Sequence, residues 1–172
     1  MRPMIEAVLK KSGDTPLIGA EIGVRLGDNA HSILKNLRIK KLILVDIWDS
    51  AVTGLTLEYK RINQGTDVNY PRVISRFKDD LRVKIHRDYS TNAVKTYANG
   101  YFDFIYIDAS HAYKNVKVDI HDWWPKVKIG GIIGGHDYFY FVGVKNAVDE
   151  FAKEHNLNIE SRCPDWWVER TE

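Results

Sequence analysis

The sequence predicts a doubly wound α/β fold whose sheet is mainly parallel. Short apolar runs alternate along the chain with segments of helical periodicity, the pattern of repeated strand–helix–strand units. Four of these runs end in glycine or charged residues, at Gly23, Asp46, Asp108 and Asp137. Because open α/β sheets bind ligands beyond the carboxyl ends of their parallel strands, these four ends predict one cleft that holds a nucleotide-like cofactor and a metal ion.

The first predicted elements run to residue 69. Met4, Ile5 and Val8 share one helical face, and the next two apolar runs have the length of strands. Asp28 or Asn29 can cap the helix between those strands, because their side chains accept hydrogen bonds from first-turn N–H groups. The elements are, in order, a helix over 3–11, a strand over 17–23, a helix from 28 or 29 to about 37, a strand over 41–47 and a loop or lid over 48–69.

The rest of the chain continues the alternation. Pro71 suits the first turn of a helix, and Ser90 or Thr91 can cap another that stops before Gly100. The turn at Pro164–Asp165 joins two short runs into an antiparallel pair. The elements are a helix over 71–78, a strand over 82–86, a helix over 90–99, a strand over 102–108, a helix marked by Val116, Ile120, Trp123 and Val127, a strand over 131–136, a helix over 144–151 and strands over 158–162 and 166–170.

Composition indicates one globular domain over residues 1–172. The net charge of +2 is too balanced to indicate a nucleic-acid partner. Cys163 is the single cysteine, which excludes an internal disulfide and favours a reducing, cytoplasmic setting. No apolar run approaches the ~20 residues of a membrane span, and residues 1–13 lack the apolar stretch of a signal peptide.

The turn after the first strand predicts a cofactor site. It contains Gly23 and Gly27, and glycine allows a backbone to approach a ligand closely. A dinucleotide fingerprint would read G-x-G-x-x-G, but Glu21 stands where its first glycine would lie. A carboxylate there would repel a pyrophosphate and could pair with a cationic amino-acid group. Asp46 is placed to accept hydrogen bonds from ribose hydroxyls. The simpler alternative is a tight turn beside a solvated strand end.

Asp108 and Asp137 end neighbouring predicted strands, so their carboxylates could converge on one divalent cation. Such oxygen ligands suit Mg²⁺. His136 adjoins Asp137, and an imidazole ligand would favour Mn²⁺, Fe²⁺, Co²⁺ or Zn²⁺ instead. Since successive side chains of a strand alternate, His136 could equally be a packed or hydrogen-bonded histidine.

Taken together, these motifs resemble the class I S-adenosylmethionine-dependent methyltransferases. Residues 102–113 (FDFIYIDASHAY) and 130–138 (GGIIGGHDY) narrow the likeness to the metal-dependent O-methyltransferase branch, which includes macrocin-type sugar methyltransferases and, more distantly, catechol O-methyltransferase. The resemblance spans roughly residues 17–170. It implies a Rossmann-like, seven-stranded sheet whose last strand is antiparallel, and a methyl transfer from S-adenosylmethionine, with Mg²⁺ or Mn²⁺, to a hydroxyl of a small molecule or sugar. That branch usually has an acid or amide where this chain has His136.

The resemblance also assigns roles to single residues. His111 corresponds to a general base, and a histidine with a pKa near 6.5 suits that chemistry. Its structural alternative is a helix cap or packing against Tyr113. The predicted metal ligands are Asp108, His136 and Asp137. The predicted cofactor-binding residues are Glu21, Gly23, Gly27, Asp46, Trp48, Asp88, Ser90 and Asp108.

Some of these assignments have structural alternatives of their own. Trp48 could stack on adenine or be a lid or core aromatic, and Ser90 could be only a helix cap. The aromatic run over 138–141 could line the acceptor pocket, although helix packing is the simpler role. One indole of the pair Trp166–Trp167 should face outward, which would indicate a homodimer surface.

Three rival functions can be weighed. Nucleic-acid or protein N-methyltransferases of this fold carry an Asn/Asp-Pro-Pro-aromatic motif after the fourth strand, where this chain has Asp108-Ala-Ser-His111. A nicotinamide-dependent oxidoreductase is disfavoured by Glu21 and by the missing fingerprint. A non-catalytic S-adenosylmethionine-binding module stays open, although the set of Asp108, His111 and Asp137 argues against it. The sequence does not identify the methyl acceptor.

Overall fold

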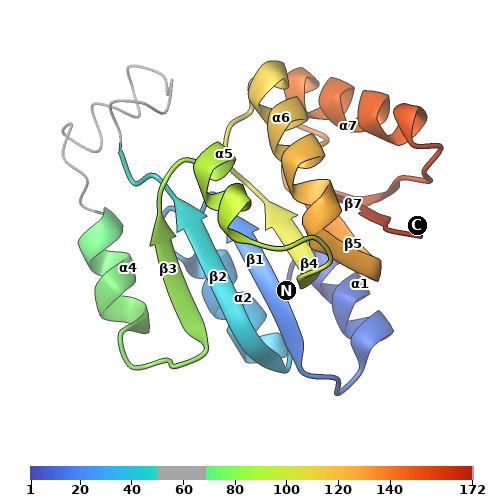
Figure 1. Ribbon diagram of the computed structural model, residues 1–172. Coiled ribbons are helices and arrows are strands. Elements are labelled where there is room, and N and C mark those ends of the chain that lie inside the picture. The colour runs from blue at the N-terminus through green and yellow to red at the C-terminus, as the bar shows by residue number, and fades with distance from the viewer. Residues whose placement is uncertain (50–68, 172) are drawn as a thin grey trace.

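The structure is a computed structural model that describes residues 1–49 and 69–171. The described residues form a seven-stranded sheet in the order β3-β2-β1-β4-β5-β7-β6. Pairing is parallel except where β7 meets β5 and β6 (Figure 1). The strands are β1 Leu17–Ile22, β2 Ile39–Asp46, β3 Val83–Arg87, β4 Phe102–Ile107, β5 Val127–Gly135, β6 Glu160–Arg162 and β7 Asp165–Glu169. The predicted doubly wound fold and C-terminal antiparallel pair are confirmed.

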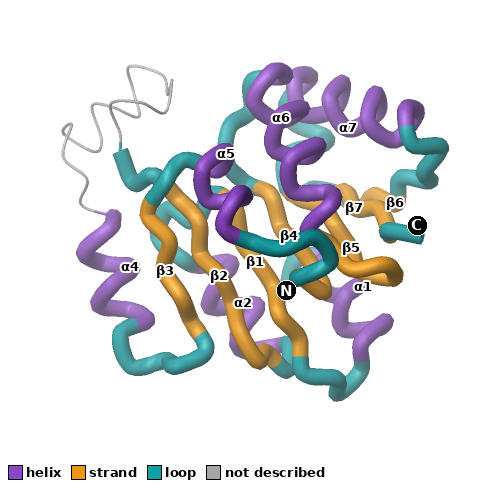
Figure 2. Tube along the Cα trace, viewed as in Figure 1, coloured by secondary structure: helices purple, strands orange, loops and turns teal. Residues whose placement is uncertain are grey.

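Helices cover both faces of this sheet (Figure 2). The helices are α1 Pro3–Ser12, α2 Asp28–Asn36, α4 Asn69–Phe77, α5 Ser90–Ala93, α6 Tyr113–Trp123 and α7 Val142–Glu154, with 3₁₀ turns η1 Val94–Thr96 and η2 Trp124–Lys126. Helices α1, α2 and α4 pack on one face, and α5, α6 and α7 on the other. None of the helices in the described ranges is long and apolar enough to cross a bilayer.

Side chains of the central strands point alternately to the two faces of the sheet, where they form two hydrophobic cores. Ile105 and Ile107 of β4 lie in the core under α5, α6 and α7, whereas Phe104 and Tyr106 lie in the core under α1, α2 and α4. This is the period of two expected of a strand buried on both faces. The sheet is therefore held rigidly from both sides, and its carboxyl edge is a fixed platform for side chains.

Several predicted boundaries differ from the structure. Helix α6 ends at Trp123, and the predicted helical residue Val127 begins β5 instead. Pro125 contributes to this, because proline lacks the backbone N–H that would donate the next hydrogen bond of the helix, and the chain continues as the 3₁₀ turn η2. Most of the predicted lid over 48–69 lies outside the described residues.

The expected side-chain caps are wrong. Gly27, in a left-handed conformation, is the N-cap of α2, and Tyr89 is the N-cap of α5; neither helix has a side-chain cap at that position. For α5, Asp88 supplies a nearby acceptor, since its Oδ1 receives hydrogen bonds from Tyr89 N at 2.7 Å and Asn92 Nδ2 at 3.1 Å.

The expected outward tryptophan is also wrong. Trp166 and Trp167 point to opposite faces of β7, as alternation requires, but they are only 1% and 9% exposed. Helix α1 contacts β7 and packs in the same core as Trp167, while Trp166 lies in the core under α5, α6 and α7, so both indoles are covered. This pair therefore presents no exposed indole for a dimer surface.

Candidate active site

The four predicted strand ends meet at one edge of the sheet. Backbone hydrogen bonds continue the strand pairing one residue beyond the strands: Gly23 N donates to Val45 O at 2.8 Å, Asp108 N to Ile22 O at 2.7 Å and His136 N to Ile107 O at 3.0 Å. In Figure 1 the arrowheads of β3, β2, β1 and β4 point toward this edge. The residues that follow these strands are therefore neighbours in space.

Glycine is required at the first turn. Gly23 has a φ of 84°, and a Cβ added there would lie 2.2 Å from the backbone oxygen of Asp108. A side chain would therefore push the ends of β1 and β4 apart. Gly27, with a φ of 77°, then redirects the chain into α2. Gly23 thus lets the turn lie against Asp108, whereas a Cβ on Gly27 would lie 2.6 Å from the ring of Phe77.

Asp46 organises this turn. Its Oδ2 accepts hydrogen bonds from Val24 N at 2.8 Å and Arg25 N at 2.9 Å, and its Oδ1 accepts one from Trp48 N at 2.8 Å. A carboxylate has about four lone-pair sites, so roughly one stays available for a ligand hydroxyl. The ribose role predicted for Asp46 stays a prediction, and the structure adds a role in fixing the turn.

Glu21 is a buried carboxyl at the end of β1. It is 1% exposed, and its Oε2 has no hydrogen-bond partner. Burial raises the pKa of Glu21 to about 8, opposed most by the neighbouring amide of Asn29 on α2. An isolated buried carboxyl is costly to ionise, and a bound cation would stabilise its charged form. The position therefore suits an ammonium group of a ligand.

Asp137 lies between two histidines. Its Oδ2 is 2.8 Å from His111 Nε2, and its Oδ1 is 2.8 Å from His136 Nδ1. Asp137 is buried, with a φ of 68° that few non-glycine residues adopt. The hydrogen bond to Asp137 raises the pKa of His111, while burial opposes the rise. Phe141 stacks on the His111 ring, with centroids 4.0 Å apart and planes inclined by 20°.

Asp108 completes this group. The ligand atoms of Asp108, His111 and Asp137 all lie within 4.8 Å of one another. His136 Nδ1 also lies near Asp108, at 3.9 Å from Oδ1. Burial raises the pKa of Asp108 to about 6, opposed by Arg2, whose Nη2 is 3.4 Å from Asp108 Oδ2.

Three other predicted residues are engaged elsewhere. Trp48 is 4% exposed, packs against Tyr70 and donates its indole N–H to Arg25 O at 3.0 Å. Stacking on adenine would require this indole to leave the core. Ser90 Oγ accepts the indole N–H of Trp123 at 2.7 Å, which ties α5 to α6. Asp88 accepts hydrogen bonds at the start of α5, from Tyr89 N and Asn92 Nδ2.

Sequence reasoning missed Arg2, Asn29 and the stacking of Phe141 on His111. Arg2 carries no motif, and only the docking of α1, where Met4 N donates to Asp165 Oδ2 at 3.1 Å, brings its guanidinium to Asp108. Asn29 was expected to cap a helix. Phe141 belongs to the aromatic run over 138–141, but nothing in the spacing pairs it with His111.

A family model described as a methyltransferase domain matches residues 20–138. No match was found among curated proteins. Among solved structures, the O-methyltransferase NovP aligns with a TM-score of 0.71 at 17% identity, over 98% of this chain and 80% of its own.

Two further structures show the same fold. CalS11, a TDP-rhamnose 3′-O-methyltransferase of calicheamicin biosynthesis, aligns with a TM-score of 0.64 at 13% identity, over 98% of this chain and 78% of its own. MycE, a methyltransferase of mycinamycin biosynthesis solved with Mg and SAH, aligns with a TM-score of 0.63 at 15% identity, over 98% of this chain and 49% of its own. Identities this low establish the fold alone. The family match, however, covers more than half of the chain, so this protein belongs to the methyltransferase domain family and is a class I S-adenosylmethionine-dependent methyltransferase.

Proposed function

We propose that this chain is an O-methyltransferase that acts on a hydroxyl of a small molecule or sugar with the help of a divalent cation. The observation that carries the proposal is the convergence of Asp108, His111 and Asp137 beside the glycine turn. The fold shared with NovP, CalS11 and MycE supports it, since the first two are described as O-methyltransferases and MycE was solved with Mg and SAH.

The cofactor would lie across the ends of β1 and β2. Glu21 would pair with the ammonium group of S-adenosylmethionine, because its buried carboxyl lacks a partner at Oε2. Gly23 and Gly27 would let the backbone approach the ligand, and Asp46 would use its remaining lone-pair site for a ribose hydroxyl.

Glu21→Gln tests this assignment. In the folded protein without ligand, the pKa of Glu21 is about 8, above the ordinary 4.5. As the pH rises from 4.5 to about 8, Glu21 ionises in the unfolded state first, so the free energy of unfolding falls. We expect the glutamine variant to be more stable than the wild type near pH ~8, by about 1–3 kcal/mol, and nearly equal near pH ~4. Its affinity for S-adenosylmethionine should fall by about 1–3 kcal/mol, the value of a hydrogen bond to a charged group. Thermal melts and calorimetry measure the two effects, and unchanged affinity would reject the ammonium contact.

Asp108 and Asp137 would hold a divalent cation, and His111 lies within the same group, where it could act either as a ligand or as the general base. An imidazole ligand favours Mn²⁺ over Mg²⁺, whereas a site that uses only the carboxylates and water suits Mg²⁺. His136 would hold Asp137 in place through the contact of its Nδ1 with Asp137 Oδ1. When bound, the cation would lower the pKa of the acceptor hydroxyl and help to position it.

His111 would remove the hydroxyl proton. If its Nε2–H donates to Asp137, then Nδ1 is the free proton acceptor, and the carboxylate fixes the tautomer and stabilises the imidazolium that forms. When bound, S-adenosylmethionine would supply the methyl group of its sulfonium for transfer to the hydroxyl oxygen, with the carbon–sulfur bond breaking, and His111 would hold the proton that the hydroxyl loses. Phe141 would keep the imidazole plane in place.

We further propose that residues 1–172 form a single domain that acts in a reducing, cytoplasmic setting and has no nucleic-acid partner. The single cysteine and the net charge of +2 support this. With both tryptophans of β7 covered, a homodimer has no support from that pair.

The proposal is tested in two steps. Calorimetry should show binding of S-adenosylmethionine and none of NAD. A library of hydroxylated metabolites and sugars is then supplied with methyl-labelled cofactor, and label should appear in an O-methyl product. EDTA should abolish the transfer, and added Mn²⁺ or Mg²⁺ should restore it. Full transfer in excess EDTA would remove the cation from the proposal, and binding without transfer to any acceptor would favour a non-catalytic module.

A further inference from the structure

A second group of polar side chains lies on the outer surface between α6 and α7. Tyr113, Lys117 and His121 follow one another at every fourth residue of α6, so they share one helical face. They meet Glu150 and Glu154, which are similarly spaced on α7. Tyr113 Oη donates to Glu150, Lys117 Nζ lies 3.0 Å from Glu150 Oε1 and 3.5 Å from Glu154 Oε1, and His121 Nε2 lies 3.2 Å from Glu154 Oε2.

The far end of this row has the composition of a metal site. His155, the residue after α7, brings a second imidazole, and the ligand atoms of His121, Glu154 and His155 all lie within 4.8 Å of one another. Two ligand atoms about 2.1 Å from a tetrahedral Zn²⁺ are roughly 3.4 Å apart, close to the 3.2 Å between His121 Nε2 and Glu154 Oε2. That contact lacks hydrogen-bond geometry, and the buried Nε2 has no hydrogen-bond partner.

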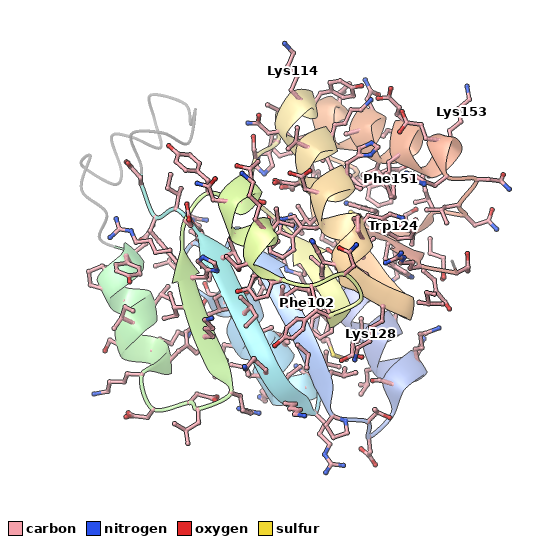
Figure 3. The ribbon with its side chains drawn as sticks, viewed as in Figure 1. Phe102, Lys114, Trp124, Lys128, Phe151 and Lys153 are labelled. Carbon is pink, nitrogen blue, oxygen red and sulfur yellow. The ribbon has the colours of Figure 1, made fainter. Side chains whose placement is uncertain are left out.

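Aromatic packing holds both imidazoles in place. The His121 ring meets Phe151 edge-on at 5.2 Å between centroids, and the His155 ring packs on Phe151 at 4.6 Å and near Trp124 at 6.1 Å. Figure 3 shows Phe151 and Trp124 close together beside α6. Glu154 and His155 are exposed, which gives an ion access from solvent. The two ligating rings are thus ordered without being sealed off.

The backbone favours a cation at the same place. His121 is in the last turn of α6, and Glu154 ends α7, so the negative ends of both helix dipoles lie near the three ligands. Lys117 contacts Oε1 of Glu154, which leaves Oε2 directed at His121.

We propose that His121, Glu154 and His155 form a surface site for a divalent transition metal such as Zn²⁺, separate from the group around Asp108. Two imidazoles and one carboxylate with an open fourth position select Zn²⁺, Co²⁺ or Ni²⁺ over Mg²⁺ and Ca²⁺. Since the ligands come from both α6 and α7, the ion links these helices at the ends farthest from His111 and Phe141. Its effect is to stabilise the pair of helices.

Zinc titration by calorimetry tests this site with matched variants. The ligand variants are His121→Asn, His155→Asn and Glu154→Gln. His31→Asn changes an exposed histidine of α2, and Asp137→Asn removes a carboxylate from the other group. The wild type should bind one Zn²⁺ ion at this site, and both control variants should bind it with the same affinity. Each ligand variant should bind it with an affinity lower by at least ~10-fold. Zinc should also raise the melting temperature of the wild type and not that of His155→Asn, while Mg²⁺ should do neither.

Two results would overturn the proposal. One is an equal Zn²⁺ affinity of the wild type and the His155→Asn variant. Because His155 is exposed, this substitution should leave the protein folded. The other is loss of all Zn²⁺ binding in a folded Asp137→Asn protein, because that would assign the zinc to Asp108, His111 and Asp137.

Discussion

Asp137→Asn is expected to reduce turnover by about 10²–10⁴-fold while the protein stays folded. Each oxygen of Asp137 contacts one imidazole, His111 Nε2 or His136 Nδ1, at 2.8 Å. Asparagine keeps the shape but removes the charge, and its NH₂ group cannot accept a hydrogen bond from an imidazole N–H. His111 would lose its orienting acceptor, and the candidate metal site would lose a carboxylate. Asparagine is preferred to alanine because it tolerates the φ of 68° at this position better.

The measurements are turnover, Mn²⁺ affinity and melting temperature. Asp149→Asn is the matched control, since Asp149 accepts a hydrogen bond from Tyr138 Oη at 2.6 Å and does not belong to the candidate metal group. That control should keep its turnover. A folded Asp137→Asn enzyme with normal activity and metal affinity would remove Asp137 from the site.

The convergence of the site was predictable from the sequence. Each central strand contains a short apolar run, and a polar or glycine residue stands at its carboxyl end. Once strands are parallel, their ends share one edge, so Gly23, Asp46 and Asp108 had to be neighbours. No side-chain detail was needed for that inference.

The positions of Arg2 and Trp167 could not be predicted, because they depend on contacts between distant parts of the chain that no local sequence pattern shows. Arg2 reaches Asp108 only because α1 docks through Asp165, 161 positions away from Met4. Trp167 is covered because that same helix lies over β7, although alternation alone would leave one indole outside. Both outcomes depend on tertiary packing between the two ends of the chain.

The roles of the two histidines beside Asp137 also required geometry. His136 adjoins Asp137 in the sequence, which made it the natural candidate ligand. In the structure its Nδ1 lies 3.9 Å from Asp108 Oδ1, and the ligand atoms of His111, Asp108 and Asp137 lie within 4.8 Å of one another, so His136 as a ligand stays a prediction. Asp137 contacts both imidazoles, with its Oδ2 2.8 Å from His111 Nε2 and its Oδ1 2.8 Å from His136 Nδ1.

His111→Ala is expected to reduce turnover by ~10²–10⁴-fold if His111 is the general base. Affinity for S-adenosylmethionine and for metal should then stay nearly unchanged. A base acts in its neutral form, and Asp137 raises the pKa of His111, so the wild-type rate should rise with pH through a value above the ordinary 6.5. This rise of the rate with pH should be missing in the variant. Turnover against pH and calorimetric affinities are the measurements.

Two other roles predict different results for the same variant. If His111 ligates the metal, the variant should bind Mn²⁺ more weakly and recover turnover when Mn²⁺ is raised. If His111 only packs, removal of the ring stacked on Phe141 should lower the melting temperature while the folded fraction keeps its turnover. Packing also has its own pH signature. Because the folded pKa of His111 is raised, its pairing with Asp137 stabilises the fold fully below pH ~6.5, and this contribution is lost as the pH rises through the raised value. A folded variant with wild-type turnover at every pH would exclude His111 as the base and leave the proton transfer to another group.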